Sequence, residues 1–184
     1  MALHYPADNL MILDYNRILK SLNGLSNEEF IAKLSQNFDI KELAEGADTK
    51  PGSIHRFSLF IGNKWHSMQL KEESLDKSTP ITQLDSQILT DLVFAPILGI
   101  TDLKKDNRID FVGGIRGHKE LERRCQIDCV ASIALHPCSI DELMNVADAN
   151  MIMPPKSTWF EPKPRSGFCV RIFESEYWWA KSFN

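Results

Sequence analysis

The sequence predicts a mixed α/β domain, of the α+β type, in which a mixed sheet packs with three to four helices. Short apolar or alternating runs, such as residues 54–61 and 129–135, are typical of strands. Two Ser-x-x-Glu capping boxes, at Ser26 and Ser139, each open a stretch with helical spacing of apolar residues. A hydrophobic content of 43% and a charged content of 25% indicate a globular chain. We therefore expect residues 1–184 to form a single compact domain.

The first half of the chain contains two predicted hairpins and one helix. Residues 1–5 and 10–13 flank the turn signal "PADN" and predict the first hairpin. The helix follows, with Ser26 as its cap. The second hairpin spans residues 54–71, where two alternating runs meet at Gly62-Asn63, a pair suited to the positive φ angles of a tight hairpin turn.

The second half of the chain alternates helices with strands. We expect a helix that is capped by Asp85 and ends near Pro96, and a short helix after the glycines of "DFVGGIRG". Strands are predicted at residues 109–112, 129–135 and 167–173, and the second of these is apolar enough to be buried on both faces. The chain ends in the aromatic cluster "YWWAKSFN", which we expect to dock onto another surface.

The charge and cysteine content narrow the classes of function. A net charge of −4 and a pI of about 5.7 argue against nucleic acid as the partner, since phosphate neutralisation favours a basic face. We also expect no membrane partner, because no apolar stretch approaches the ~20 residues that span a bilayer. The four cysteines form no Cys-x-x-Cys pair, so we expect no metal site and predict reduced thiols in a cytoplasmic protein. They are Cys125, Cys129, Cys138 and Cys169.

The segment "DFVGGIRG" is the strongest local signal for binding. Backbone amides at a helix start favour an anion, and Gly113 and Gly114 would let the backbone approach a ligand closely. Arg116 adds a planar charged donor. The pattern matches neither the dinucleotide fingerprint nor a phosphate loop. The alternative is a tight turn in which Arg116 pairs with a carboxylate such as Asp110.

The proline-rich stretch "MPPKSTWFEPKPRSGF", residues 153–168, is the second candidate. Prolines lower the entropy cost of holding a loop for a ligand. The alternative is a stiff arm that Trp159 and Phe160 anchor in the core. Five residues of the stretch can contact an anion directly, namely Lys156, Ser157, Thr158, Lys163 and Arg165.

Two further features remain open on sequence grounds. His136 ends a predicted strand and could serve as a general base, although a hydrogen-bonded structural histidine is the commoner case. The segment "DYNR", residues 14–17, could present Asn16 and Arg17 to a site. The favoured interpretation of this segment is a solvated ion pair.

Four segments together resemble the domain of unknown function 1015 family. They are "LHYPADNLMILDYNRILKSLNGLS", "FAPILGI", "RIDFVGGIRG" and "ALHPCSIDELMNVADANMIMPPKSTWFEPKPRSGF". Members of that family are longer and carry an Asp-Gly-His-His-Arg motif upstream of the first segment. That motif is similar to one in ParB-like nucleotide-binding proteins and free-serine kinases, and it is absent from this sequence. The resemblance therefore implies that residues 1–184 are the C-terminal half of a longer protein.

The resemblance implies two hypotheses of different classes. In the first, this chain supplies an anion-binding surface to a nucleotide-dependent small-molecule kinase or phosphotransferase, with ATP or ADP and magnesium as cofactors of the full-length protein. Its partners would be the missing N-terminal half and a small anionic metabolite, and this chain alone would be inactive. In the second, the chain is a non-catalytic packing or homodimerisation module, with the Trp178-Trp179 tail and the proline-rich stretch as contact surfaces.

The two candidate segments are expected to meet at one edge of the sheet. A single short helix connects the predicted strands at residues 109–112 and 129–135, so the strands should run in the same direction. Their carboxyl ends would then share the edge that ligands favour in open α/β sheets. This places the glycine turn beside the His136-Pro137 end of the second strand. The helix that begins at Ser139 then carries the chain toward the opposite edge, so the proline-rich stretch joins the glycine turn only if it folds back. The prediction is a single anion site in which Arg116 is the main charge, and the alternative is that the stretch is an arm away from it.

Overall fold

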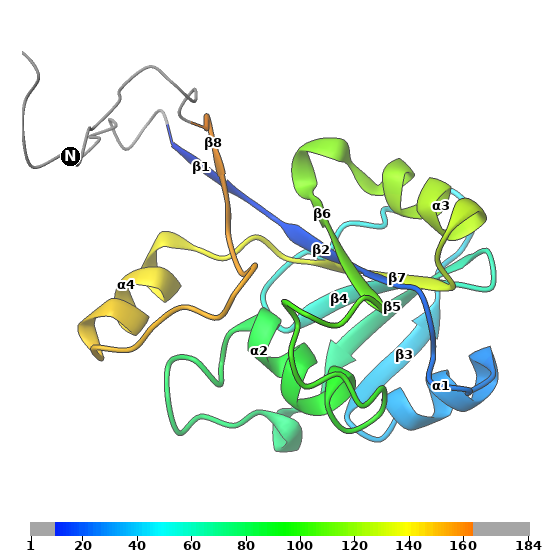
Figure 1. The fold of residues 1–184 in the computed structure, drawn as a ribbon, viewed down its shortest axis with the longest axis horizontal. Helices are drawn as coiled ribbons and strands as arrows, with labels where there is room; N and C mark the ends of the chain where they lie inside the picture. The colour runs from blue at the N-terminus through cyan, green and yellow to red at the C-terminus, as the bar shows by residue number, and fades with distance from the viewer. Residues whose placement is uncertain (1–9, 164–184) are drawn as a thin grey trace, which may run out of the picture. The chain divides into compact units, whose positions relative to one another are not determined.

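The computed structural model describes residues 10–163 (Figure 1). The chain divides into two compact units, residues 12–159 and the combination of residues 1–11 with 160–184. The expectation of a single domain therefore stays a prediction. Within the described residues, four α-helices belong to the larger unit. They are α1 (Asn27–Leu34), α2 (Asp85–Leu89), α3 (His118–Ile127) and α4 (Ile140–Asp148).

A six-stranded sheet forms the centre of the larger unit, with strand order β3-β5-β4-β7-β2-β6. Every neighbouring pair in it is antiparallel, so the α+β class is confirmed but the sheet is not of the mixed type. β1 and β8 form a separate two-stranded sheet. The strand bounds are β1 (Met11–Leu13), β2 (Tyr15–Leu19), β3 (Phe38–Glu42), β4 (Arg56–Ile61), β5 (Lys64–Leu70), β6 (Ile109–Gly113), β7 (Ala131–Leu135) and β8 (Trp159–Glu161).

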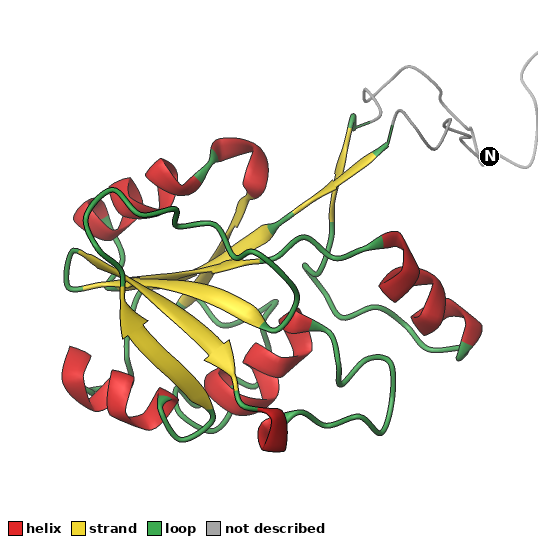
Figure 2. Ribbon diagram, turned by 180° about the vertical axis from the view of Figure 1, so that it is seen from behind, coloured by secondary structure: helices red, strands yellow, loops and turns green. Residues whose placement is uncertain are grey.

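Helices lie on both faces of the sheet (Figures 1 and 2). The larger core lies on the side of α1 and α2, where Leu19, Leu59 and Ile133 are fully buried. A smaller cluster around Ile18 and Leu121 packs beneath α3 on the other face. Because alternate residues of a strand point to opposite faces, β2 supplies Leu19 to one core and Ile18 to the other.

Local signals in the sequence correctly predicted several elements. Ser26 and Ser139 each complete a capping box, with the hydroxyl accepting from the backbone amide three residues on. The β4–β5 hairpin turns at Gly62 and Asn63, which have φ angles of 57° and 61°. These signals act over a few residues, which is why they can be recognised without the rest of the fold.

Other elements differ from the prediction. Asp85 does not cap α2, because Leu84 is the cap residue and the Asp85 side chain instead accepts from the backbone amide of His55 at 2.8 Å. A π-helical turn, Thr90–Phe94, follows α2 directly. Strands β2 and β3 were not predicted. The strands expected at residues 1–5 and 167–173 and the aromatic end of the chain lie outside the described residues.

Candidate functional site

The carboxyl ends of β6 and β7 lie at the same edge of the sheet. Both strands pair antiparallel with β2, so they run in the same direction, as the sequence predicted, although β2 separates them. The register places Tyr15, the first residue of β2, opposite Gly113, the last residue of β6. The "DYNR" segment therefore lies beside the glycine turn.

The glycines of the turn have a packing role in the structure. A Cβ atom on Gly113 would lie 2.5 Å from the Trp159 ring, and one on Gly114 would lie 2.0 Å from Oδ1 of Asp14. The backbone amide of Gly114 donates to the backbone carbonyl of Asp14 at 2.8 Å, so this amide is already used. Close packing thus accounts for both glycines, while their direct contact with a ligand stays a prediction.

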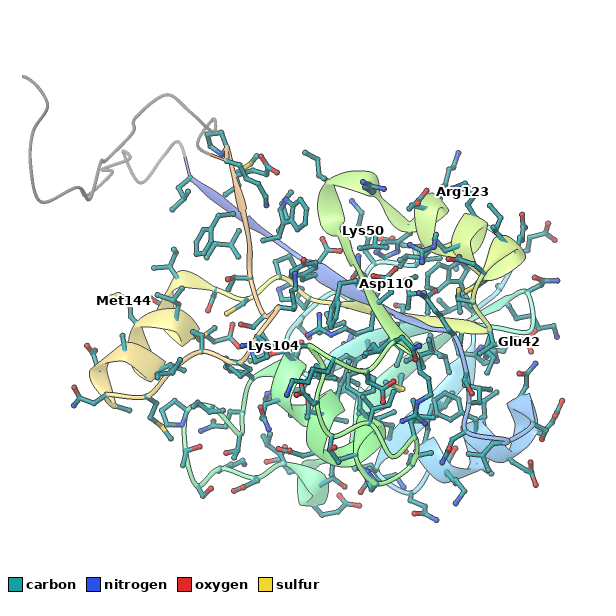
Figure 3. The ribbon with its side chains drawn as sticks, in the orientation of Figure 1. Glu42, Lys50, Lys104, Asp110, Arg123 and Met144 are labelled. Atoms are coloured by element: carbon teal, nitrogen blue, oxygen red, sulfur yellow. The ribbon has the colours of Figure 1, made fainter. Side chains whose placement is uncertain are left out.

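Arg116 lies at the surface, where 66% of its side chain is exposed. Its nearest carboxylate is that of Glu120, with 3.9 Å between Nη1 and Oε1, and Glu120 also pairs more closely, at 2.7 Å, with Arg123. Asp110 pairs with Arg124 at 2.7 Å and not with Arg116; Figure 3 labels both Arg123 and Asp110. Arg116 therefore has a single loose ion pair among residues 10–163.

The proline-rich stretch meets the glycine turn. Trp159 packs on Gly113 and forms an edge-to-face pair with Tyr15, with 5.2 Å between ring centroids. The ammonium group of Lys156 donates to the Tyr15 hydroxyl at 3.2 Å and lies 5.5 Å from the centroid of that ring. It also lies 5.9 Å from the centroid of Phe111. Lys156, Tyr15 and Phe111 thus form one cation–aromatic cluster.

The other four predicted binding residues of the proline-rich stretch lie outside this cation–aromatic cluster or outside the described residues. The Ser157 hydroxyl donates to the backbone carbonyl of Pro154 at 2.7 Å, and Thr158 is half-buried. Lys163 belongs to the other compact unit, and Arg165 lies outside the described residues. A site shared by Lys156, Lys163 and Arg165 therefore stays a prediction.

The "DYNR" segment does not form the solvated ion pair that the sequence favoured. Asn16 and Arg17 are fully buried. Oδ1 of Asn16 accepts from the backbone amide of Leu135 at 3.0 Å and so links β2 to the end of β7. Arg17 forms no salt bridge with any described residue, and its guanidinium lies 5.1 Å from the centroid of Phe111. The prediction was wrong because β2 is a central strand, which removes both side chains from solvent.

Polar side chains, buried or half-buried, also surround a small cavity between α2, the end of β7 and α4. Its lining includes Asp85, Ser86, His136, Glu142 and Ser157. The centre of a water molecule could occupy a volume of about 10 Å³ in this cavity. This is close to the minimum that a single bound water requires. Burial raises the pKa of the Asp85 carboxyl to about 8, against the opposing effect of the hydrogen bond from the His55 amide. Asp85 Oδ2 and the Ser86 hydroxyl have no hydrogen-bond partner in the part of the chain that the structure describes.

His136 and the cysteines fit structural roles. Nδ1 of His136 lies 3.1 Å from the backbone carbonyl of Pro51, as expected for a hydrogen-bonded structural histidine. Cys125, Cys129 and Cys138 are free thiols, in agreement with the prediction for these three. In the described part of the chain, there is no group of three or more His, Cys, Asp or Glu side chains that could hold a metal ion.

A cleft of about 390 Å³ lies beside strands β3, β5 and β4 and was not predicted. Its lining includes three basic residues, Lys41, Lys50 and Arg56, together with Asp39 and Asp48. These residues come from separate segments of the sequence, and only the pairing of the strands brings them together. The near balance of charges in the cleft gives no clear preference for an anion. Among residues 10–163, no helix has the length and hydropathy to cross a membrane.

Comparison with solved structures first defines the class of fold. A free serine kinase in complex with AMP is 14% identical, with a TM-score of 0.51, and the match covers 86% of this chain and 56% of that chain. A mutant of a free serine kinase, also in complex with AMP, is 17% identical, with a TM-score of 0.50 and the same coverage. The likeness shows a shared fold, and this chain spans little more than half the length of either structure.

Comparison with protein families then supports the resemblance noted in the sequence. Residues 1–87 match the family described as "Protein of unknown function (DUF1015)". This match confirms the predicted resemblance over that part of the chain. A comparison with curated proteins gave no match.

Proposed function

We propose that this chain provides a small-anion-binding surface for a nucleotide-dependent small-molecule kinase or phosphotransferase. The observation that carries the proposal is the cluster of Lys156, Tyr15 and Phe111, where the proline-rich stretch meets the edge of the sheet. Lys156 is exposed and forms no salt bridge among the described residues, so its charge is available to a ligand. A protein catalyses phosphoryl transfer mainly by positioning the reactants and by stabilising the charge that develops on the phosphoryl group.

The likeness in fold to free serine kinase structures supports the kinase part of the proposal. Because the chain spans 56% of those structures, we assign the nucleotide, magnesium and catalytic groups to a longer protein that contains this chain. The free thiols described above favour a cytoplasmic location, and the net charge of −4 favours a small ligand over nucleic acid.

Isothermal titration calorimetry of the full-length protein with ATP, ADP and L-serine tests this function. We expect saturable binding of at least one of these ligands and about a tenfold loss of affinity in Lys156→Met, as one charge-assisted contact is worth about 1.5 kcal/mol or more. Lys104→Met is the matched control, since Lys104 is exposed and lies in a loop before β6. Equal affinities in the two variants would contradict the proposal.

Activity measurements provide a separate test. We expect residues 1–184 alone to transfer no phosphoryl group, because the sequence offers no recognisable catalytic set and the described residues contain no cluster of three or more potential metal ligands. Phosphotransfer above background from this chain alone would contradict the assignment of catalysis to the longer protein.

One observation favours a packing or dimerisation module as the second candidate function. On α4, the side chains of Ile140 and Met144 lie one turn apart and are 51% and 49% exposed (Figure 3 labels Met144). Exposed apolar groups at this spacing suit a contact with another protein surface. Light scattering of the wild type and of Met144→Lys distinguishes the two functions. A dimer that Met144→Lys dissociates, in a protein that binds none of the three ligands, would favour the second.

A further inference from the structure

Arg17 is a buried cation on β2, an interior strand of the sheet. It has no exposed surface, and no carboxylate pairs with it among the described residues. Nη1 donates to the backbone carbonyl of Tyr15. Nε and Nη2 are buried and have no hydrogen-bond partner among residues 10–163.

An arrangement of this kind is costly to the fold. Burying a charge without a partner costs several kcal/mol, and replacing it with an apolar side chain of similar volume is often neutral or stabilising. Burial lowers the pKa of Arg17 to about 10, so the guanidinium remains charged at neutral pH. A residue that costs stability in this way is a candidate for a role in function.

The two free nitrogens lie on the same edge of the guanidinium. Nε and Nη2 together present the side-on pair of donors with which arginine binds a carboxylate or phosphate through two parallel hydrogen bonds. The third nitrogen is held by Tyr15, which fixes the orientation of the plane. The unused donors of Arg17 are therefore those that match a planar or tetrahedral anion.

A second cation lies near the aromatic ring that Arg17 contacts. The Arg17 guanidinium lies 5.1 Å from the centroid of the Phe111 ring, and the Lys156 ammonium group lies 5.9 Å from the same centroid. Among the described residues, no carboxylate forms a salt bridge with either cation. Asp14 accepts from the neutral side chain of Asn16, and Asp110 pairs with Arg124. Two cations thus share one ring, with Lys156 exposed and Arg17 buried.

We propose that Arg17 is the fixed cation of an anion subsite, in which a phosphate or carboxylate group of a ligand pairs with its Nε–Nη2 edge and with Lys156. This inference rests on the proposed function and deepens it. The ligand enters from the side of Lys156, the exposed member of the cluster, when that side chain moves away from the Tyr15 hydroxyl. The half-buried rings of Tyr15 and Phe111 line the approach.

Thermal unfolding of the protein, with and without probe anions, tests the inference. The probes are sodium pyrophosphate for a phosphate ligand and L-serine for a carboxylate ligand, with sodium chloride at equal ionic strength as the control for screening. A probe at ten times its dissociation constant should raise the wild-type midpoint by about 4 °C. Arg17→Met should unfold at or above the wild-type midpoint without a probe and should show no increase with it.

Further variants separate the possible outcomes. Arg17→Lys keeps the charge but not the paired donors, so a probe should raise its unfolding midpoint by less than it raises that of the wild type. If Arg17→Met does not fold, the response of Arg17→Lys tests the inference in its place. A wild-type response that Lys156→Met abolishes and both Arg17 variants retain would reject Arg17 while leaving the proposed function intact. If neither probe exceeds the sodium chloride control in the wild type, the subsite is rejected and Arg17 is a structural residue.

Discussion

The buried carboxyl of Asp85 gives a prediction about the dependence of stability on pH. Only 7% of this residue is exposed, and within residues 10–163 its side chain accepts a hydrogen bond from one group, the backbone amide of His55. Burial raises its pKa from the ordinary 3.8 to about 8. We predict that Asp85→Asn, which keeps the side chain neutral at every pH, removes the resulting pH dependence.

The sign and size of the effect follow from the two pKa values of Asp85. As pH rises, the unfolded chain releases this proton near pH 4, whereas the folded protein holds it until about pH 8. The free energy of unfolding therefore falls with rising pH across that window and is level above it. Each unit of difference corresponds to about 1.4 kcal/mol, so the total is on the order of 5 kcal/mol.

Urea denaturation followed by tryptophan fluorescence at several pH values within that window measures this effect. The wild type should lose stability relative to Asp85→Asn at a rate approaching 1.4 kcal/mol per pH unit. Asp76→Asn is the control. Asp76 is exposed, and the hydrogen bond that it accepts from the Ser78 backbone amide lowers its pKa. Its contribution to the pH dependence of stability is therefore confined to pH values below about 4. A constant difference between the wild type and Asp85→Asn would refute the reasoning.

Three other predictions concern packing, capping and the thiols. Gly113→Ala should lose about 1–3 kcal/mol of stability because the new Cβ would overlap the Trp159 ring, whereas Gly52→Ala, with nothing within 4 Å, should lose far less; equal losses in urea denaturation would contradict this. Ser139→Ala should lose about 1 kcal/mol by removing the capping box of α4, and an unchanged denaturation midpoint would show that the cap is not stabilising. A thiol titration of the denatured, unreduced protein should give four free thiols, and a count of two or zero would contradict the reduced state.

The parts of the fold that the sequence predicted are those fixed by neighbouring residues. The Gly62-Asn63 turn and the two capping boxes depend on contacts within about four positions, and each was found where expected. Strand β2 was missed because Asn16 and Arg17 interrupt the apolar alternation that identifies a buried strand. Only the pairing of β2 with β6 and β7, both at least 90 residues further along the chain, buries these two side chains, and no local pattern reveals that pairing.

The candidate site was predictable only in part for the same reason. Lys156 could be identified from its place after two prolines, because it is an exposed donor in a stiff segment. The aromatic partners of Lys156 could not be identified from the sequence. The β2–β6 register places Tyr15 near Phe111, and Lys156, about 140 residues after Tyr15, packs against these rings only in the folded chain. The burial of Asp85 is likewise a result of packing between distant segments, so the sequence suggested a helix cap where the structure has a buried carboxyl.

The most direct test of the account is to locate the bound anion. Backbone amide chemical shifts of the isotope-labelled protein should be recorded during titration with pyrophosphate, ADP and L-serine. The account predicts that the largest saturable shifts occur at Tyr15, Arg17, Phe111, Gly114 and Lys156, the residues of the cluster and the adjoining turn. Shifts confined to other parts of the chain, or no saturable shifts with any of the three compounds, would contradict it.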